Sequence, residues 1–179
     1  MPRLFTGVEL PDDVAADLAL KRGGIPGARW IDEESFHITL RFIGDIDETL
    51  ATEIAYGLAQ AAGPAFTLTL RGVDVFGGNK PHTLYAGVED NAELRRLQAA
   101  HERICQMMGA APDPRRFSPH VTLARLKDAE PMGLSHFVQR HSLYRSRPFR
   151  VERFVLFSSR PARGGGPYAV EQAYDLRIA

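Results

Sequence analysis

The chain has 179 residues, of which 44% are hydrophobic and 25% charged, a balance typical of folded globular proteins and not of disordered chains. Basic and acidic residues number 22 each, so the formal net charge is zero. That balance argues against a protein that coats long nucleic acid by bulk electrostatics, but it leaves room for a pocket that binds one phosphate.

Two kinds of site and two locations are disfavoured by the sequence. The single cysteine, Cys105, excludes an intramolecular disulfide and a four-cysteine zinc site. No apolar run reaches the ~18 residues that a membrane span requires, and the N-terminal stretch does not resemble a signal peptide. We therefore expect a monomer of the reducing cytoplasm with no membrane partner.

Strand and helix patterns follow one another irregularly along the chain. Helices are predicted after Pro11, after Asp47 as N-cap, after Asp90 with Glu93 as a capping box, and from Pro131 to about His141. The strand patterns cover residues 3–10, 36–43, 66–71, 82–88, 120–126, 148–158 and 168–177, with loops at 77–81 and, as an expected mobile segment, 160–167.

This order does not alternate as in a doubly wound parallel sheet. We expect an α+β fold, mainly antiparallel with helices packed outside the sheet. No linker is long enough to separate independent domains, so residues 1–179 are expected to form one domain.

Residues 36–43 give the clearest strand. Because side chains alternate between the two faces of a strand, His37, Thr39 and Arg41 are expected on one face. The face directed to the core is expected to carry Phe36, Ile38, Leu40 and Phe42.

Part of this strand is duplicated. The sequence His37-Ile38-Thr39-Leu40 recurs as His120-Val121-Thr122-Leu123, 83 residues later. For this composition, chance repetition is expected only roughly 2 times in 1000, so we treat the repeat as a signal. Each copy presents an imidazole and a hydroxyl side by side on one face of a strand.

Two such strands facing one cleft suit acid–base chemistry at phosphorus. One neutral imidazole takes a proton from the attacking water or hydroxyl, and an imidazolium gives a proton to the leaving oxygen. The threonine hydroxyls donate hydrogen bonds to the non-bridging oxygens. Zinc is a weaker interpretation, because each copy offers one histidine and no Asp, Glu or Cys two residues on.

The remaining candidate side chains fit structural roles better. His101 and Cys105 lie on the apolar stripe of a predicted helix, and His136 and His141 belong to a predicted surface helix. His82 is adjacent to a loop and is a weak candidate for lining a cleft. The acidic run 32–34 is expected to cap a loop or face solvent.

With their flanking residues, the two motifs resemble those of the 2H phosphoesterase superfamily, in its branch of RNA 2′,3′-cyclic phosphodiesterases that were once called 2′-5′ RNA ligases. The resemblance runs through nearly the whole chain. It is carried by residues 3–11, Trp30, 35–44, 72–76, 118–125 and 154–159.

The resemblance implies a bilobal fold with pseudo-two-fold symmetry, in which each lobe contributes one motif to a central groove. It implies opening of a terminal 2′,3′-cyclic phosphate on RNA to a 2′-phosphate, without a metal or other cofactor. By the same resemblance, His37 is the proton donor and His120 the proton acceptor. The residues implied to hold the phosphate are Thr39, Thr122 and Arg125.

Two details follow from strand parity and from the aromatic residues. Arg125 has the opposite parity to His120 and Thr122, so it reaches the groove only if a bulge or the strand end follows Leu123. Phe76 and Tyr85 are candidates for stacking on a base, with core packing as the alternative.

Three alternatives to RNA hydrolysis remain. In the first, the groove serves small cyclic nucleotides or a cyclic phosphate on ADP-ribose. Reversible 2′-5′ ligation of RNA is chemically allowed, since a catalyst serves both directions. A non-catalytic module that binds a nucleotide is the third alternative, against which the two intact motifs argue.

Overall fold

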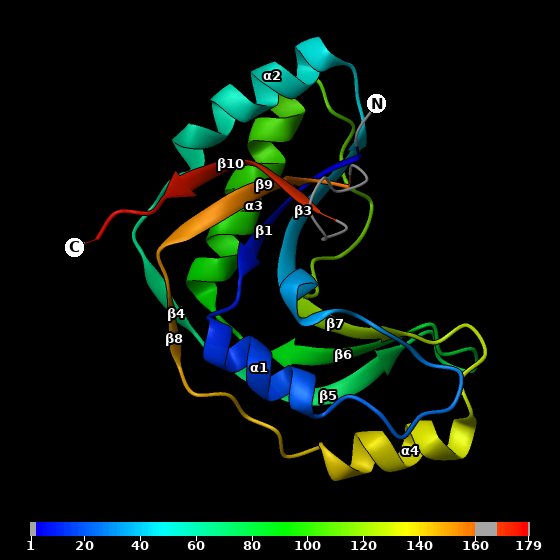
Figure 1. The fold of residues 1–179 in the computed structure, drawn as a ribbon. Helices are drawn as coiled ribbons and strands as arrows, with labels where there is room; N and C mark the ends of the chain where they lie inside the picture. Colours follow the sequence, from blue (N-terminus) through cyan, green and yellow to red (C-terminus); the bar gives the residue numbers. More distant parts are fainter. Residues whose placement is uncertain (1–2, 160–167, 179) are drawn as a thin grey trace.

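The computed structural model describes residues 3–159 and 168–178, so the predicted loop at 160–167 lies outside the described residues. Its main sheet follows the order β10-β9-β1-β3-β7-β6-β5, with the short β2 paired to β7 (Figure 1). The strands are β1 (Arg3–Glu9), β2 (Arg29–Trp30), β3 (His37–Asp45), β5 (Leu70–Phe76), β6 (Thr83–Val88), β7 (His120–Arg125), β9 (Arg153–Ser158) and β10 (Ala169–Asp175). Every pairing in this sheet is antiparallel, which confirms the predicted α+β class.

In residues 3–159 and 168–178, four helices pack beside the sheet. They are α1 (Asp12–Leu20), α2 (Glu48–Gly57), α3 (Ala92–Met107) and α4 (Pro131–Arg140), and two short 3₁₀ turns are η1 (Glu33–Ser35) and η2 (Leu58–Ala61). Figure 1 shows α2 and α3 beside the half of the sheet that contains β1 and β3, and α1 and α4 beside the other half. None of the helices in this part of the chain combines the length and apolarity needed to cross a bilayer.

The register of the strands reveals two equivalent halves. In one half β3 pairs with β1 and β1 with β9; in the other β7 pairs with β6 and β6 with β5. The pair Val8 and Ile38 in the first half corresponds to the pair Ala86 and Val121 in the second. Likewise, the pair Phe5 and Phe157 corresponds to the pair Thr83 and Phe76. The halves meet where Ile38 of β3 pairs with Val121 of β7, which is the pseudo-two-fold arrangement that the resemblance implied.

Both motif strands carry a bulge at the same place. Along β7 the partners on β6 pass from Tyr85 opposite Thr122 to Leu84 opposite Ala124, so Leu123 is the extra residue. Along β3 the partners on β1 pass from Gly7 opposite Thr39 to Thr6 opposite Arg41, so Leu40 is the extra residue. A bulge reverses the parity of the residues that follow it.

Two predicted strands are each divided between two sheets. Residues 66–71 were expected as one strand, but β4 (Phe66–Leu68) leaves the main sheet and pairs with β8 (Phe149–Val151). Residues 148–158 divide in the same way into β8 and β9. The apolar pattern continues through both breaks because both pieces bury side chains in one core, so periodicity alone did not reveal the change of sheet.

The helix starts were predicted with mixed success. The Asp47 carboxylate accepts from the backbone N–H of Leu50 at 2.7 Å, which confirms it as the N-cap of α2. The predicted capping box at Asp90 was wrong, since the side chain that caps α3 is Asn91, which accepts from the N–H groups of Glu93 and Leu94. Both residue types suit this position, and only the structure shows which one takes it.

Candidate active site

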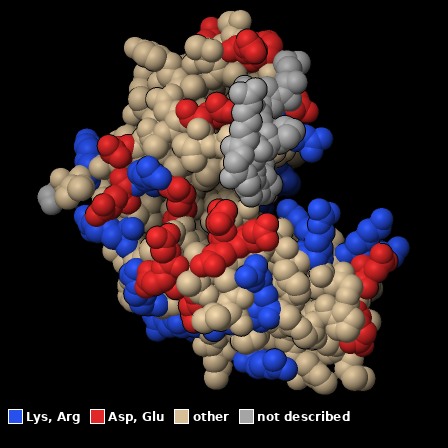
Figure 2. All heavy atoms as spheres, viewed as in Figure 1, with Lys and Arg blue, Asp and Glu red and all other residues tan. Residues whose placement is uncertain are grey.

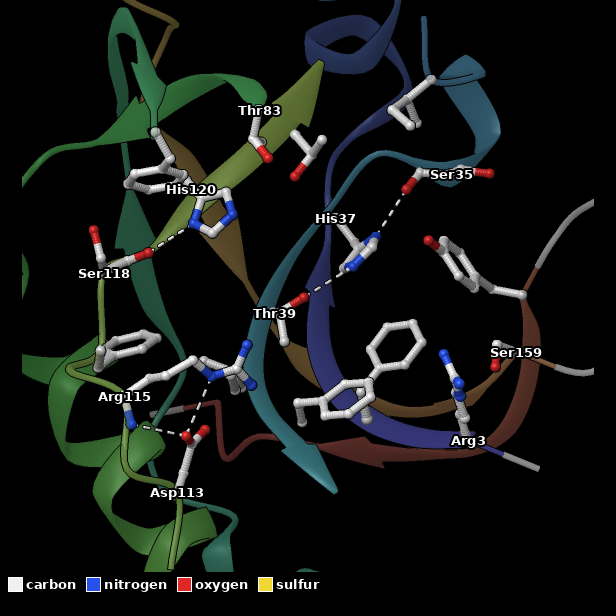
Figure 3. A pocket seen from close by; sticks show the side chains of 18 of the residues that line it. Arg3, Ser35, His37, Thr39, Thr83, Asp113, Arg115, Ser118, His120 and Ser159 are labelled. Atoms are coloured by element: carbon white, nitrogen blue, oxygen red, sulfur yellow. Dashed lines mark hydrogen bonds and ion pairs between the residues drawn. The ribbon is translucent and has the colours of Figure 1, made fainter. Parts of the chain in front are cut away.

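A groove of about 950 Å³ lies at the junction of the two halves. Figure 3 shows His37 of β3 and His120 of β7 projecting into it from neighbouring strands, with Thr39 between them. The residues predicted from sequence that line the groove are His37, Thr39, Phe76, His82, His120, Thr122 and Arg125. Tyr85 is not among the lining residues, because its ring stacks behind Phe76 with 4.0 Å between centroids.

The two imidazoles are oriented in the same way. Nδ1 of His37 lies 2.8 Å from the carbonyl oxygen of Ser35, and Nδ1 of His120 lies 2.7 Å from the carbonyl oxygen of Ser118. Because a carbonyl oxygen only accepts, Nδ1 carries the hydrogen in both rings, and Nε2 carries the lone pair of each neutral ring. Each motif therefore includes a serine two residues before its histidine, and the backbone of that serine fixes the tautomer.

Aromatic side chains hold both rings from the side. His37 packs against Phe5, Phe157 and Tyr168, at centroid distances of 5.1, 5.7 and 5.3 Å. His120 meets the edge of Phe76 at 4.9 Å and of Tyr85 at 5.5 Å. These contacts leave each imidazole little freedom to rotate away from the groove.

The surroundings lower the pKa of both histidines below its ordinary value. Burial is the main cause for each ring, since it penalises the charged form, and the positive charge of Arg125 adds to it. The pKa of His37 is lowered further by the charge on His120, so the two imidazoles interact across the groove. The serine carbonyls act in the opposite direction, because they accept from the protonated rings.

The threonines and Arg125 complete the polar lining. The Thr39 hydroxyl lies 3.0 Å from Nε2 of His37 and can donate to its lone pair, whereas no hydrogen bond occupies the Thr122 hydroxyl within the described residues. Arg125 reaches the groove because the bulge at Leu123 reverses its parity, as the sequence required. Its guanidinium donates to the Thr83 hydroxyl at 3.2 Å.

The matching bulge at Leu40 overturns the expected facing of two residues on β3. Arg41 was expected beside His37 and Thr39, yet it is buried on the opposite face with 4% of its surface exposed. Phe42 was expected in the core, yet it lines the groove and is 40% exposed. By register, Phe42 is the counterpart of Arg125, and Arg41 is the counterpart of Ala124.

Buried Arg41 anchors the segment that leads into the second motif. Its guanidinium donates to a carboxylate oxygen of Glu102 on α3 and, at 2.5 Å, to the carbonyl oxygen of Ala111. The other Glu102 oxygen accepts from the N–H of Asp113 at 3.0 Å. A side chain of the first motif strand thus holds the loop 111–118, which supplies the carbonyl that orients His120.

Several groove residues were not anticipated from the sequence. The loop 111–118 contributes Arg115 and Arg116, and the guanidinium of Arg115 lies 5.8 Å from the ring centre of Phe42. The first half contributes Arg3, Phe5 and Tyr168. Phe42 is exposed only because of the bulge, and the other residues reach the groove through contacts between distant segments. None of them had a local signal in the sequence.

The other candidate side chains lie outside the groove. His101 is fully buried and bonded to Thr6, and Cys105 is buried, which raises the pKa of its thiol to about 11. His136 is exposed on α4. Within residues 3–159 and 168–178, no three His, Cys, Asp or Glu side chains gather at a point where they could hold a metal ion.

The fold and the groove define a class of protein, the phosphoesterases with two His-x-Thr strands facing one groove. Residues 24–162 match the sequence profile of the 2′-5′ RNA ligase superfamily. The chain belongs to this superfamily, as the paired motifs implied.

Named relatives and solved structures agree with this assignment. A protein of Aeropyrum pernix named RNA 2′,3′-cyclic phosphodiesterase is 44% identical over 108 residues, which are 59% of this chain and 61% of the relative. A protein of the same name from Thermus thermophilus is 30% identical over 98% of this chain and 90% of its own length.

Among solved structures, TT0787 of Thermus thermophilus has a TM-score of 0.80 at 26% identity and covers 98% of both chains. The E. coli LigT structure with 3′-AMP has a TM-score of 0.79 at 22% identity, covering 98% of this chain and 99% of its own, which shows a shared fold. This chain spans about three-fifths of the length of the Aeropyrum pernix relative.

Proposed function

We propose that the protein hydrolyses a terminal 2′,3′-cyclic phosphate on RNA and leaves a 2′-phosphomonoester. The relatives named above carry this activity in their names. The observation that carries the proposal is the equivalence of the two histidines, since each is held at Nδ1 by a carbonyl and directs Nε2 into one groove. That arrangement suits a proton donor and a proton acceptor at one phosphorus atom.

The reaction needs two proton transfers. His120 accepts a proton at Nε2 from water, whose oxygen forms a bond to phosphorus. As the bond from phosphorus to the 3′ oxygen breaks, protonated His37 gives its Nε2 proton to that oxygen. The products are a 3′ hydroxyl and a 2′-phosphate, and a second proton exchange with solvent returns both rings to their starting states.

The remaining polar groups stabilise charge on the phosphate. The Thr39 hydroxyl turns from Nε2 of His37 to a non-bridging oxygen, and Thr122 and Arg125 donate to the others. The anionic phosphate also favours the protonated form of His37, and this opposes the burial that lowers the pKa of His37.

Aromatic side chains on the two walls of the groove are available to stack on a base. Phe76 and Tyr85 already stack on each other and support His120, and Phe76 exposes its remaining surface to the groove. Phe42 offers a second face on the other wall, with Arg115 above it. A Phe42→Leu change keeps the apolar volume and removes the ring, so a base-dependent rise in KM would identify the ring that stacks.

The test of the proposed function is hydrolysis of an oligoribonucleotide with a 2′,3′-cyclic phosphate in the presence of a chelator. We expect a product with a 2′-phosphate, and loss of turnover in His37→Ala and His120→Ala. His136→Ala, which removes an exposed histidine of α4, is the matched control and should keep full activity. Normal turnover in either groove variant, or loss of activity with the chelator, would contradict the proposal.

A further inference from the structure

The sheet edge beside the groove, at the end of β7, carries basic side chains next to Arg125 that the reaction does not use. Arg29 of β2 is the register partner of Arg125 on β7. Directly paired residues of neighbouring strands point to the same face of a sheet, so Arg29 shares the face on which Arg125 meets the groove. The next pair, Trp30 and Ala124, points to the other face, where Trp30 packs against Phe137 of α4.

Two lysines join this pair of arginines. The backbone N–H of Leu126 donates to the carbonyl oxygen of His82 at 3.0 Å, which places the end of β7 beside the loop that precedes β6. Lys127 follows Leu126, and Lys80 lies two residues before His82, both exposed. The sequence has three lysines, and two of them are therefore at this edge. We call Arg29, Lys80, Arg125 and Lys127 the basic lip.

The basic lip has little compensating negative charge. Within the described residues, no ion pair joins any of its four members to an acidic side chain. The carboxylates closest in sequence are Asp128, which follows Lys127, and Asp32, three residues after Arg29. Figure 2 shows Lys and Arg side chains gathered at one edge of the hollow between the two halves, with Asp and Glu side chains along the neighbouring part of the rim. For a chain of zero net charge, this is a local concentration of cations.

The corresponding edge of the other half has the opposite character. The end of β3 and the start of α2 carry Asp45, Asp47 and Glu48. Arg3 lies 3.7 Å from Asp45 there, and Arg115, which lies over Phe42, is 3.3 Å from Asp113, so both of these cations have a carboxylate partner. Arg116 of the same loop also lines the groove. A polyanion that has its end at the two histidines is therefore attracted more strongly along the edge that carries the basic lip.

We propose that the basic lip binds the backbone phosphates of an RNA strand upstream of the cyclic phosphate, so that the substrate is an oligonucleotide end in preference to a mononucleotide. This inference rests on the proposed function. It extends that function from one phosphate to a strand, and it favours RNA over the small cyclic nucleotides that fit the same groove.

The test compares a short oligoribonucleotide and a mononucleoside, each with a 2′,3′-cyclic phosphate, on the native protein and a triple variant Arg29→Gln, Lys80→Gln, Lys127→Gln. Arg125 stays unchanged because it lines the groove. Each lost contact with a single-stranded phosphate lowers the slope of log(kcat/KM) against log salt by about 0.7. We expect the oligonucleotide slope to fall by about 2 and its KM to rise about tenfold at moderate salt, relative to the mononucleotide.

A second triple variant removes the same charge elsewhere. The changes are Lys21→Gln, Arg140→Gln and Arg150→Gln. Lys21 and Arg140 line a separate hollow and Arg150 lies on β8, so this variant should leave the preference for the oligonucleotide intact. Equal losses on both substrates, equal losses in the two triple variants, or a native protein with no greater salt dependence for the oligonucleotide would overturn the inference.

Binding separates this inference from the proposed function. Fluorescence anisotropy with a labelled oligoribonucleotide that ends in a 3′-phosphate requires no turnover. If neither cyclic phosphate is hydrolysed but the first triple variant alone weakens binding about tenfold, RNA binding by the basic lip is supported and the proposed reaction is contradicted. If hydrolysis proceeds and this binding is unchanged in the first variant, the basic lip is refuted while the proposed function survives.

Discussion

The two halves of the groove have the same backbone and different side chains at the positions that matter. Ser35 and Ser118, His37 and His120, and Thr39 and Thr122 match in type, and a bulge follows each threonine by one residue. After the bulges the match ends. The first half continues with Arg41 and Phe42, and the second half with Ala124 and Arg125.

A further difference lies one strand away. Tyr85 lies opposite Thr122 and packs against His120, but its counterpart opposite Thr39 is Gly7. A Cβ on Gly7 would lie 2.7 Å from the carbonyl oxygen of Ile38 and 3.3 Å from the ring of Phe157. The ring of Phe157 from β9 supports His37 instead. Duplication thus provides two imidazoles that are held in the same way, and the groove position after each bulge is Phe42 in one half and Arg125 in the other.

The largest expected effect comes from removing either histidine. His37→Ala and His120→Ala should each lower kcat/KM by at least about 100-fold, the usual contribution of a general acid or base. The pH dependence of the residual rate should distinguish the two variants. Without the acid His37, the rate depends on deprotonation of the base His120, and without the base it depends on protonation of His37. It should rise with pH in His37→Ala and fall with pH in His120→Ala, measured as kcat/KM profiles.

The native profile provides the reference. We expect a bell whose midpoints lie below the ordinary histidine value near 6.5, because burial and Arg125 lower the pKa of both rings. The opposite slopes in the two variants would exchange the roles of donor and acceptor. A monotonic native profile would argue against a pair of titrating groups.

The next effect concerns the arginine that has no counterpart. Arg41→Met leaves the carboxylate of Glu102 without its cation, and a broken buried pair costs about 3 kcal/mol of unfolding free energy, an upper value here because Glu102 is partly exposed. Urea unfolding measures this. Arg147→Met breaks the pair with Asp13, which is exposed and screened by water, and should cost much less stability than Arg41→Met.

Arg41 should also affect His120 and spare His37. The loop 111–118 supplies the Ser118 carbonyl, and this hydrogen bond raises the pKa of His120. In Arg41→Met, NMR titration should therefore find a lower pKa for His120 and an unchanged one for His37, which keeps its own bond to Ser35. Equal shifts in both rings would mean that the loop is not what Arg41 controls.

Much of this comparison was accessible from the sequence because strand period and motif repetition are local signals. They predicted that His37, Thr39, His120 and Thr122 face one groove, which these residues do line. The family resemblance pointed to Arg125, and strand parity then required a bulge for that side chain to reach the groove. The matching bulge at Leu40 was missed, because no charged residue at Phe42 demanded one, and the assignments of Arg41 and Phe42 were consequently wrong.

Contacts between distant segments left no local signal. Phe66–Leu68 pairs with Phe149–Val151 in a separate sheet. Each of these segments belongs to a longer apolar pattern that is typical of one continuous strand, so the sequence did not show where the chain changes sheet. The link from Arg41 to Glu102 joins residues 61 apart, and Arg115 approaches Phe42 only because that link holds its loop. Alternation reports burial on one face of a strand and does not report the partner.

A smaller effect is expected from the groove cation. Arg125→Gln keeps a donor but removes the charge, and hydrogen bonds to charged groups contribute about 1.5–3 kcal/mol, so kcat/KM should fall roughly 10- to 100-fold. Because the charge of Arg125 lowers the pKa of both histidines, both limbs of the pH profile should move to higher pH. Phe42→Leu, at the matched position of the other half, should leave the limbs in place. A profile that shifts equally in both variants would remove the distinction between the halves.

The smallest effect at neutral pH should come from a buried polar pair that exists in one half only. Thr6 contacts Nδ1 of His101 at 2.8 Å, whereas the counterpart of Thr6 in the other half is the apolar Leu84. Burial lowers the pKa of His101 to about 3. Between the ordinary value near 6.5 and that value, the unfolded chain binds a proton that the folded chain does not.

Because of His101, the free energy of unfolding should therefore decrease by up to about 1.4 kcal/mol per pH unit as the pH falls below 6.5. Above pH 6.5, His101 should not change it. The double variant Thr6→Val, His101→Leu replaces both partners with apolar groups, so we expect stability near the native value at pH 7. Urea unfolding at pH 7 and pH 5 should show a smaller decline in the variant than in the native protein. Because His37 and His120 are present in both proteins, the difference between the two declines isolates His101, and identical declines would mean that its proton affinity does not change on folding.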